Sequence, residues 1–458
     1  MTTTMPEPCP IDFARPLEGW EHLFSLIDRH RTVHFAMSAQ IEGVTSIPAW
    51  RAALDKLQER HPLLSVAIKI NDGSAPHFRA VRNAPIPLRV TAGPTVASWQ
   101  REIARELATP FDAQQAPLAR AVLMHGQYES VFILTTHHSI ADGLSSAYAI
   151  RDLIRLLSGE NLECLPPIPA LEPLLYMLQR APNDMDDPAQ PEAPKQGRAV
   201  TFRAVDGSLP HIDALHLTPV TTRRLVERAR EERTTVHGAL CAALVLAGRE
   251  SFTYWNGSPV RVMSPFNLRK ELGIGKDCGL FVWAGSVSMN PGTPSDFWEI
   301  ARYAKSSLTE KQSLGRVATE LEGLEQAMHP GIDVPGAAQL FAQVLPFELL
   351  LTNLGKLSVQ FDTDSLRLKA LWGPALLTGF ENEQTVGVTT TNDSLCLLHT
   401  TFTPIPSLLS RAAEILRRAC ERHVDRPEMS NDGTRPDQSQ AIETTGSNLP
   451  LEYMDAKR

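Results

Sequence analysis

The sequence has no long hydrophobic run, which excludes the usual helical membrane anchor. None of its apolar stretches approaches the roughly 20 residues that a helix needs to cross a bilayer. Met1 to Pro10 contain neither a basic region nor an apolar core, so they lack the composition of a signal peptide. We therefore expect a cytoplasmic protein without a membrane span.

The sequence also has few cysteines and little positive charge. The cysteines lack the spacing of metal ligands, and several lie in apolar runs, so we expect reduced and mostly buried thiols. They are Cys9, Cys164, Cys241, Cys278, Cys396 and Cys420. The formal net charge of −8 argues against nucleic acid as a partner.

The 458 residues are too many for one ordinary core, so we expect two domains of about 200 residues each. Changes in composition place an N-terminal half at residues 1–165 and a Pro-rich crossover or linker at 166–198. They place a C-terminal half at 199–425 and a polar tail at 426–458, which we expect to be disordered.

Hydrophobic periodicity predicts the main elements. A helix is expected from Ser46 to His61, where Pro62 follows, and another from Thr221 to Glu232. The small residues from Thr235 to Leu244 predict a buried, closely packed helix. The predicted strands are Thr32 to Met37, Leu64 to Ile70, Arg120 to Met124, Val131 to Leu134, Val260 to Met263, Leu280 to Ser288, Leu349 to Thr352, Thr385 to Thr390 and Leu395 to Thr401.

The most informative segment is Thr136-His137-His138-Ser139-Ile140-Ala141-Asp142-Gly143. It follows a short apolar strand and precedes a stretch with helical spacing, so it is expected to be a strand-to-helix loop. Loops of this kind often display reactive groups, and histidine is suited to proton transfer near neutral pH. The pattern indicates a catalytic loop.

A structural interpretation is also open. Asp142 is suited to be a helix N-cap that accepts from the backbone N–H of Ser145, with Gly143 easing the turn. Both histidines could be hydrogen-bonded core residues. No metal is expected, because the histidines have no third ligand at a plausible spacing.

A similar strand, loop and helix recurs 264 residues later. Residues 393–399 match 129–135 in their pattern of a turn followed by a strand. At this offset Phe402 stands in the place of His138, and Pro406 in the place of Asp142. One repeat is weak evidence, but it predicts two halves with one fold, of which only the first carries the imidazole and the acid.

The His-His-x-x-x-Asp-Gly segment resembles the coenzyme-A-dependent acyltransferase superfamily. Its flanks support the resemblance: they are Pro110-Phe111-Asp112, Pro117-Leu118-Ala119-Arg120 and Arg60-His61-Pro62-Leu63-Leu64. That superfamily includes condensation domains of nonribosomal peptide synthetases, polyketide-associated O-acyltransferases and chloramphenicol acetyltransferase. The resemblance implies two α/β (α+β) two-layer sandwiches of the chloramphenicol acetyltransferase type. They would form a V-shaped pseudo-dimer with an active-site tunnel between them.

The resemblance also implies roles for single residues. His138 would be the general base, and His137 would point to the opposite side because neighbouring strand residues alternate. Asp142 would be mainly structural and paired with Arg269 of the other half. The backbone of Gly143 would approach the reacting centre and could stabilise an oxyanion.

Two weaker candidates complete the expected site. Asn353 corresponds to a family position on the tunnel floor or the crossing strand. Ser139, inside the loop, is also expected to line the substrate tunnel.

One departure from the pattern favours ester formation. Peptide-forming members carry Gly-x-Phe-Val-Asn-Thr-x-Pro-Leu-Arg, whereas here Gly279-Leu280-Phe281-Val282 continues as Trp283-Ala284-Gly285-Ser286. The sequence also shows no adenylation or carrier region. We therefore expect a free-standing O-acyltransferase of polyketide or nonribosomal peptide metabolism, acting as a monomer.

The expected co-substrate is an acyl thioester of coenzyme A or of a phosphopantetheine carrier, with an acyl or peptidyl carrier protein as partner. The acceptor would be a small alcohol, and no cofactor would be tightly bound. Amide formation with an amine acceptor is the alternative. A non-catalytic module that binds carrier proteins is a third reading.

Overall fold

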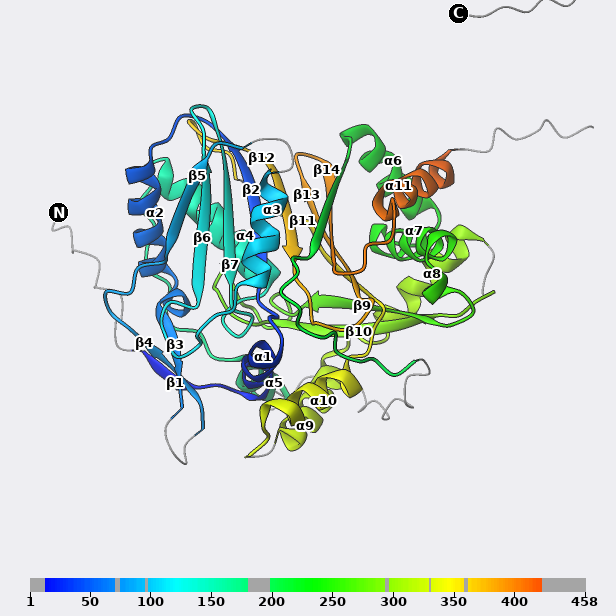
Figure 1. The fold of residues 1–458 in the computed structure, drawn as a ribbon, viewed down its shortest axis with the longest axis horizontal. Helices are drawn as coiled ribbons and strands as arrows, with labels where there is room; N and C mark the ends of the chain where they lie inside the picture. Colours follow the sequence, from blue (N-terminus) through cyan, green and yellow to red (C-terminus); the bar gives the residue numbers. More distant parts are fainter. Residues whose placement is uncertain are drawn as a thin grey trace, which may run out of the picture. The chain divides into compact units, whose positions relative to one another are not determined.

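The computed structural model describes residues 13–70, 75–94, 98–179, 198–292, 296–328, 331–357 and 361–421 (Figure 1). Met1–Cys420 forms one unit and Glu421–Arg458 another. All the elements below belong to the first unit. The predicted tail at 426–458 and residues 180–197 of the predicted linker lie outside the described residues.

The first lobe is built on a five-stranded sheet with the order β12-β2-β7-β6-β5. Its strands are β2 (Phe35–Glu42), β5 (Leu88–Ala92), β6 (Ala119–His125), β7 (Glu129–Thr136) and β12 (Arg367–Ala375). In the middle of the sheet β7 is antiparallel to β2, with Thr136 opposite Phe35, and it is also antiparallel to β6.

Helices cover both faces of this sheet, which explains why β7 is buried from Ser130 to Thr136 and apolar from Val131 to Leu134. They are α2 (Ile47–Arg60) and α4 (Gly143–Leu157) on one face and α3 (Ser98–Ala108) on the other. Phe132 packs on the α2 side, stacked against Trp50 at 5.2 Å between ring centroids. Its neighbours Val131 and Ile133 pack on the α3 side.

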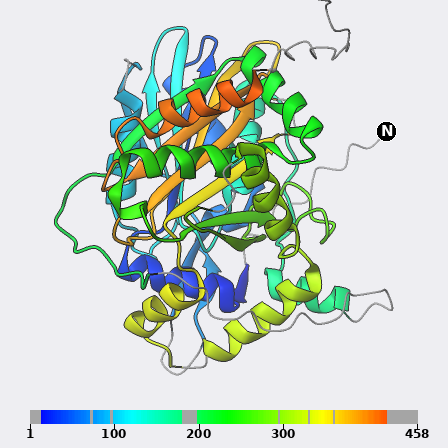
Figure 2. The ribbon, with the colours of Figure 1, turned by 90° about the vertical axis from the view of Figure 1, so that its right-hand side faces the viewer.

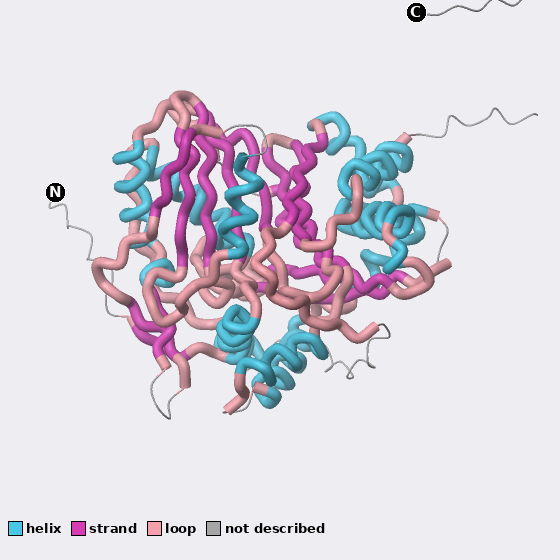
Figure 3. The backbone as a smooth tube through the Cα atoms, in the orientation of Figure 1, coloured by secondary structure: helices cyan, strands magenta, loops and turns pink. Residues whose placement is uncertain are grey.

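The second lobe is built on a six-stranded sheet with the order β10-β9-β11-β13-β14-β8. Its strands are β8 (His211–Leu217), β9 (Val260–Asn267), β10 (Val282–Met289), β11 (Leu349–Lys356), β13 (Gln384–Thr391) and β14 (Ser394–Thr401). The helices on its outer face are α6 (Pro219–Glu231), α7 (Val236–Ser251), α8 (Phe297–Thr309) and α11 (Leu408–Cys420) (Figure 2). The two sheets stand out in Figure 3.

The predicted small-residue helix is α7, and its close packing is confirmed. A Cβ at Gly238 would lie 2.5 Å from the carbonyl oxygen of Ala301 in α8, and one at Gly248 would lie 2.3 Å from the Trp255 ring. Larger side chains at these two positions would push the neighbouring elements away.

Strand β12 crosses from the second half of the sequence into the first sheet. It pairs with β2, with Trp372 opposite Ser38, while its neighbours in sequence belong to the second lobe. Trp372 packs against Trp99 of α3 at 5.3 Å and belongs to a buried cluster that also contains Leu398 of β14. This crossing joins the inner faces of the two lobes.

The remaining helices α1 (Gly19–His30), α5 (Leu171–Gln179), α9 (Leu314–Ala327) and α10 (Val334–Val344) lie together at one edge of the two lobes (Figure 1). The other elements are the strands β1 (Ala14–Pro16), β3 (Val66–Lys69) and β4 (His77–Ala80) and the short turns η1 (Pro62–Ser65) and η2 (Thr253–Trp255), of which η2 packs on α7. The three strands form a separate sheet with the order β1-β4-β3.

The fold class predicted from the sequence is confirmed, with two α/β lobes that each carry a mixed sheet and covering helices. Two details differ from the prediction. The range 166–198 is not wholly a linker, because Leu171–Gln179 forms α5. The range Leu64–Ile70 is a strand only from Val66 to Lys69, because Pro62 starts a short 3-10 turn.

The predicted repeat is present in the order of elements. β14 begins 265 residues after β7, at 394 against 129, and α11 begins 265 residues after α4, at 408 against 143. This offset is one residue longer than the one read from the sequence. On it Thr403, not Phe402, corresponds to His138, and Ser407 corresponds to Asp142.

Candidate active site

The loop of residues 137–142 connects β7 to α4 and is buried. His137, Ser139, Ile140 and Ala141 have no exposed surface, and Asp142 is 2% exposed. The backbone N–H of His137 donates to the carbonyl of Leu118 at 2.9 Å, so the loop starts in register with the sheet. The second lobe covers this loop, because Asp142 N–H donates to the Gly279 carbonyl at 3.1 Å.

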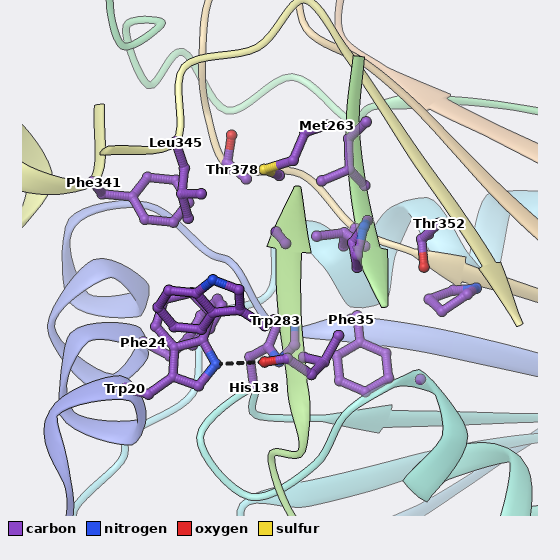
Figure 4. Close-up of a pocket in the computed structure, with 17 residues that line it drawn as sticks. Trp20, Phe24, Phe35, His138, Met263, Trp283, Phe341, Leu345, Thr352 and Thr378 are labelled. Atoms are coloured by element: carbon purple, nitrogen blue, oxygen red, sulfur yellow. Dashed lines mark hydrogen bonds between the residues drawn. The ribbon is translucent and has the colours of Figure 1, made fainter. Parts of the chain in front are cut away.

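His138 lines a cavity between the lobes (Figure 4). Its Nδ1 lies 3.1 Å from the carbonyl oxygen of Ala141. Since a carbonyl only accepts, Nδ1 carries the proton and Nε2 keeps the lone pair. The ring stacks on Phe24 at 4.1 Å and packs on Phe35 at 4.9 Å.

The environment of His138 keeps its imidazole neutral. Burial lowers the pKa of His138 to about 4, against weaker opposing contributions from a backbone hydrogen bond and from the charge of Asp142. At neutral pH the side chain therefore holds a free lone pair on Nε2. That is the state a general base requires.

His137 is in a different place. Its Nδ1 accepts from the backbone N–H of Ser139 at 3.2 Å and from the Ser139 hydroxyl at 2.6 Å. Its Nε2 lies 3.5 Å from Oδ2 of Asp28 and, among the described residues, has no hydrogen-bond partner. Burial lowers the pKa of His137 despite the nearby Asp28.

Ser139 therefore does not line the cavity, contrary to the sequence prediction. Its hydroxyl is directed at His137, on the side of the loop away from His138, and its side chain is fully buried. His137 and Ser139 thus lie together on one side of the loop and His138 on the cavity side, within a turn in which the His137 carbonyl accepts from the backbone N–H of Ile140 at 3.2 Å.

Asp142 serves both predicted purposes at once, with one carboxylate oxygen for each. Oδ1 caps α4, accepting from the backbone N–H of Ser145 at 2.8 Å. Oδ2 accepts from Nη1 of Arg269 at 2.6 Å and from the backbone N–H of Phe281 at 3.0 Å. The pairing with Arg269 predicted from the sequence is present, and it does not compete with the N-cap.

Ser145 extends this contact between the lobes and was not predicted as a site residue. Its hydroxyl accepts from Nη2 of Arg269 at 2.8 Å and from the backbone N–H of Gly279 at 3.1 Å. Nη2 of Arg269 also donates to the Asp277 carbonyl at 2.8 Å. Helix α4, Arg269 and residues 277–281 thus form one buried polar network, which fixes the loop that carries His138.

Gly143 lies beside His138 on the cavity wall. It is the first residue of α4, where backbone N–H groups have no acceptor within the helix. A Cβ here would lie 2.7 Å from Cγ of Pro374 and 2.9 Å from Cδ2 of Leu354, so only glycine fits. Strands β11 and β12 thus leave no room for a side chain here, and the predicted oxyanion role of Gly143 stays a prediction.

Asn353 does not line the cavity. In β11 it follows Leu349 and Leu351, which pack into the outer core, whereas Leu350 and Thr352 line the cavity. The Asn353 Oδ1 accepts from the backbone N–H of Gly355 at 2.8 Å. Because side chains alternate along the strand, Thr352 faces the cavity and the predicted Asn353 does not.

The cavity has a volume of about 70 Å³, and the rest of its wall is apolar except for Thr378. Besides His138, Gly143 and Thr352 its lining residues are Trp20, Phe24, Phe35, Met263, Pro265, Val282, Trp283, Ala284, Phe341, Leu345, Leu350, Pro374, Leu376 and Thr378. Trp20 Nε1 donates to the Val282 carbonyl at 3.0 Å, which ties α1 to β10 beside His138 (Figure 4).

The sequence did not indicate these aromatic residues. Trp20, Phe24 and Phe341 occupy apolar positions of amphipathic helices, which look the same whether they face a core or a cavity. Trp283 stood in the segment that departs from the family pattern, and this departure was the one available signal.

Two family models match different halves of the chain. Residues 23–171 match the family model described as condensation domain, and residues 206–372 match that of the phthiocerol/phthiodiolone dimycocerosyl transferase C-terminus. The two matches confirm the resemblance to the coenzyme-A-dependent acyltransferase superfamily that was read from the sequence. The N-terminal half matches one of these family models and the C-terminal half the other.

Relatives of known sequence in this superfamily are much longer than the chain. Surfactin synthase subunit 2 of Bacillus subtilis is 28% identical over 195 residues, which are 42% of this chain and 5% of that protein. Tyrocidine synthase 3 of Brevibacillus parabrevis is 32% identical over 126 residues, which are 27% of this chain and 2% of that protein. The chain thus spans only a small part of these relatives.

Solved structures show the same fold over most of the chain. Polyketide synthase associated protein 5 of Mycobacterium tuberculosis has a TM-score of 0.59 at 18% identity, covering 89% of this chain and 98% of that one. The condensation domain of the Monacolin K polyketide synthase MokA has a TM-score of 0.61 at 15% identity, with 89% and 97% covered.

The described residues hold neither a membrane-spanning helix nor a cluster of metal ligands. Helices long and apolar enough to cross a bilayer are absent from this part of the chain. Nor do three or more His, Cys, Asp or Glu side chains in it converge as metal ligands would.

Proposed function

We propose that this protein transfers an acyl group from a thioester donor to a hydroxyl acceptor, with His138 as the general base. The observation that carries the proposal is the state of His138, whose Nδ1–H is committed to the Ala141 carbonyl and whose Nε2 lone pair is free beside an apolar cavity. Nε2 would take the hydroxyl proton as the acceptor oxygen attacks the thioester carbonyl.

Gly143 would stabilise the charge that develops on the carbonyl oxygen. Its backbone N–H lies in the first turn of α4, next to His138, and the positive end of the helix dipole lies there too. The Asp142 network would position both groups, because Asp142 caps the same helix turn and is held by Arg269. Asp142 would thus be a positioning residue that does not touch substrate.

The apolar cavity would hold the hydrocarbon part of a substrate. Aromatic and aliphatic side chains from both lobes surround it, and its polar side chains are His138, Thr352 and Thr378. Burying an acyl chain there would contribute about 0.8 kcal/mol for each methylene. A donor bound to a carrier protein fits the relatives, which are synthases, and polyketide or nonribosomal peptide metabolism is the proposed setting.

Ester formation is preferred over amide formation because of residues 283–286. Peptide-forming members carry Asn-Thr-x-Pro where this chain has Trp283-Ala284-Gly285-Ser286. Trp283 and Ala284 line the cavity. Amide formation is the second candidate, supported by the match of residues 23–171 to the condensation domain.

The test is a turnover assay with an acyl thioester, both free and carried by a candidate carrier protein, and a matched panel of alcohols and amines. Loss of the acyl group is followed by intact mass. Ester products with the alcohols alone support the proposal, and amides alone select the second candidate. A protein that binds the acyl carrier but releases no acyl group to any acceptor would be a binding module.

A further inference from the structure

A row of aromatic rings extends from His138 along the wall of its cavity. The His138 ring stacks on Phe24, Phe24 packs against Trp20, and Trp20 packs against Trp283. Successive ring centroids lie 4.1, 4.8 and 4.8 Å apart. All four side chains line the cavity (Figure 4). A hydrocarbon chain that starts at His138 and follows this row therefore reaches Trp283 last.

The indole of Trp283 stands between the cavity and the solvent beside α9. Its Nε1 donates to Oε2 of Glu320 in α9 at 2.7 Å. Oε1 of the same carboxylate accepts from Nε of Arg316 at 2.9 Å. The Glu320 side chain is 38% exposed, whereas Trp283 is 4% exposed. One part of the ring thus lines the cavity, and its N–H is held by a carboxylate at the surface.

Neighbouring groups keep this indole in place. The Trp20 ring packs on it at an interplanar angle of 50°. Trp20 is itself fixed twice, because its Nε1 donates to the Val282 carbonyl at 3.0 Å and its backbone N–H donates to Oε1 of the buried Glu172 at 2.8 Å. Trp283 can therefore leave its position only by breaking the hydrogen bond to Glu320 and sliding past a fixed ring.

The other aromatic residues of the wall are packed within the core. The rings of Phe24 and Phe35 hold the His138 imidazole, and Phe341 packs against Phe380 at 5.7 Å. Truncating one of them would leave a void inside the protein. Trp283 borders the partly exposed Glu320 instead, so its truncation would open the cavity toward the surface.

The space enclosed by these rings is small. The cavity has a volume of about 70 Å³. An apolar cavity of roughly 150 Å³ is needed to take up benzene, so this one holds about three carbon atoms. Overfilling a packed interior forces side chains out of their preferred conformations. A longer hydrocarbon chain therefore requires Trp283 to move.

On the basis of the acyl transfer proposed above, we propose that Trp283 sets the length of the acyl group. The donor is then the thioester of a short acyl group, with about two to four carbon atoms. Its carbonyl lies beside His138 and Gly143, and its chain follows the row of rings until the indole stops it. Trp283 contacts the end of the chain and takes no part in proton transfer.

The experiment compares straight-chain acyl thioesters of coenzyme A, from acetyl to octanoyl, with one alcohol acceptor. In the wild type, kcat/KM should fall at least about tenfold between propionyl and octanoyl. In Trp283→Ala the ratio of kcat/KM for octanoyl to that for propionyl should rise at least about tenfold, since each buried methylene contributes roughly fourfold to affinity. The ratio is taken within one preparation, so a partial loss of folded protein cancels.

Three outcomes overturn the proposal. The first is a wild-type protein that transfers octanoyl as well as propionyl. The second is an unchanged ratio in Trp283→Ala. The third is a variant in which the preferred size of the alcohol changes but the acyl series does not, because the ring would then border the acceptor.

Failure of the proposed acyl transfer would give a different result, because no thioester of the series would lose its acyl group to any acceptor. The length limit is then measured from the binding of the same thioesters by calorimetry. Binding of the propionyl but not the octanoyl thioester, with both bound by Trp283→Ala, supports the role of Trp283. Equal binding of the two thioesters by the wild type overturns it.

If Trp283→Ala does not fold, Glu320→Ala decides the question. Glu320 is partly exposed, and its loss removes the acceptor that holds the indole. The ratio for octanoyl to propionyl should rise by about threefold. Glu322→Ala, which removes an exposed carboxylate from the same helix, is the matched control and should leave the ratio unchanged. Equal ratios in Glu320→Ala and Glu322→Ala overturn the proposal.

Discussion

The loops that follow β7 and β14 have the same place in their lobes and opposite environments. Between β7 and α4 every residue from His137 to Asp142 is buried. Between β14 and α11 the equivalent loop contains the exposed Pro404, Pro406 and Ser407, and Phe402 is half-buried beneath the Arg203 guanidinium at 4.1 Å. The same strand, loop and helix thus supports a site in one lobe and a surface loop in the other.

The difference lies in what covers each loop. Residues 267–281 of the second lobe pair the aspartate of the first loop, β12 packs on Gly143, and Phe24 and Phe35 bury its histidine. Burial therefore turns an ordinary connection into a candidate active site, and the motif alone does not. This view makes predictions about both loops.

The largest expected effect is that of His138→Ala. If Nε2 is the general base, the rate of acyl transfer should fall by roughly 10² to 10⁴, while the fold is kept because the residue borders a cavity. Phe402→Leu in the second loop is the control and should leave the rate nearly unchanged. The measurement is kcat/KM with an acyl thioester, beside a thermal melt of each variant. Near wild-type transfer by His138→Ala would remove the catalytic role.

Next in size is the loss of stability in Asp142→Ala or Arg269→Ala. Both side chains are at most 5% exposed, so either change leaves a buried charge without its partner and should cost about 3–5 kcal/mol. The double variant should lose less than the sum of the single variants in denaturant unfolding. The exposed pair Lys356 and Asp393 is the control, and its removal should not change stability measurably. Additive losses at Asp142 and Arg269 would show that they act independently.

A smaller effect is expected for Gly143→Ala. The added methyl group would lie 2.7 Å from Pro374 and 2.9 Å from Leu354, so strand β12 must shift at a cost of about 1–3 kcal/mol. Gly323→Ala is the matched control, since this helical glycine has no atom within 4 Å of an added Cβ and should gain about 0.5–1 kcal/mol. The stability of both variants is measured by thermal unfolding. Equal stability of Gly143→Ala and Gly323→Ala would contradict the close packing of Pro374 and Leu354 on Gly143.

How much could be predicted from the sequence depends on how local the signal is. His138, Asp142 and the helix after them belong to one short motif, so the loop was foreseen from local sequence. The pairing of Asp142 with Arg269, 127 residues away, was predicted from the family resemblance. Strand β12 was missed, because its pairing of Trp372 with Ser38 spans most of the chain and leaves no local mark. α5 was missed because a Pro-rich stretch surrounds Leu171 to Gln179.

The cavity was predicted only in part, for a geometric reason. A sequence gives the alternation along β11 but not which face is turned inward, so Asn353 was chosen where Thr352 lies. Ser139 was misplaced because its hydroxyl hydrogen-bonds to Nδ1 of His137, a contact within the loop that the sequence does not mark. The offset of the repeat was predicted one residue too small. The prediction compared a turn and a strand in sequence, whereas the register of each strand is fixed by the strands it pairs with.

The smallest expected effect is on the pH dependence of kcat/KM, which should differ from that of an enzyme with an exposed catalytic histidine. A surface imidazole with a pKa near 6.5 would lose half of its basic form at that pH. Burial lowers the pKa of His138 to about 4, so its basic form should persist as the pH falls from about 8 to about 6. kcat/KM should therefore stay level over this interval and decline only toward the lower pKa. A plot of kcat/KM against pH for a stable acyl thioester checks this, with thermal melts at each pH to exclude unfolding. A decline centred near 6.5 would mean that His138 is solvated in the working enzyme, and the contrast between the buried and exposed loops would then lose its electrostatic basis.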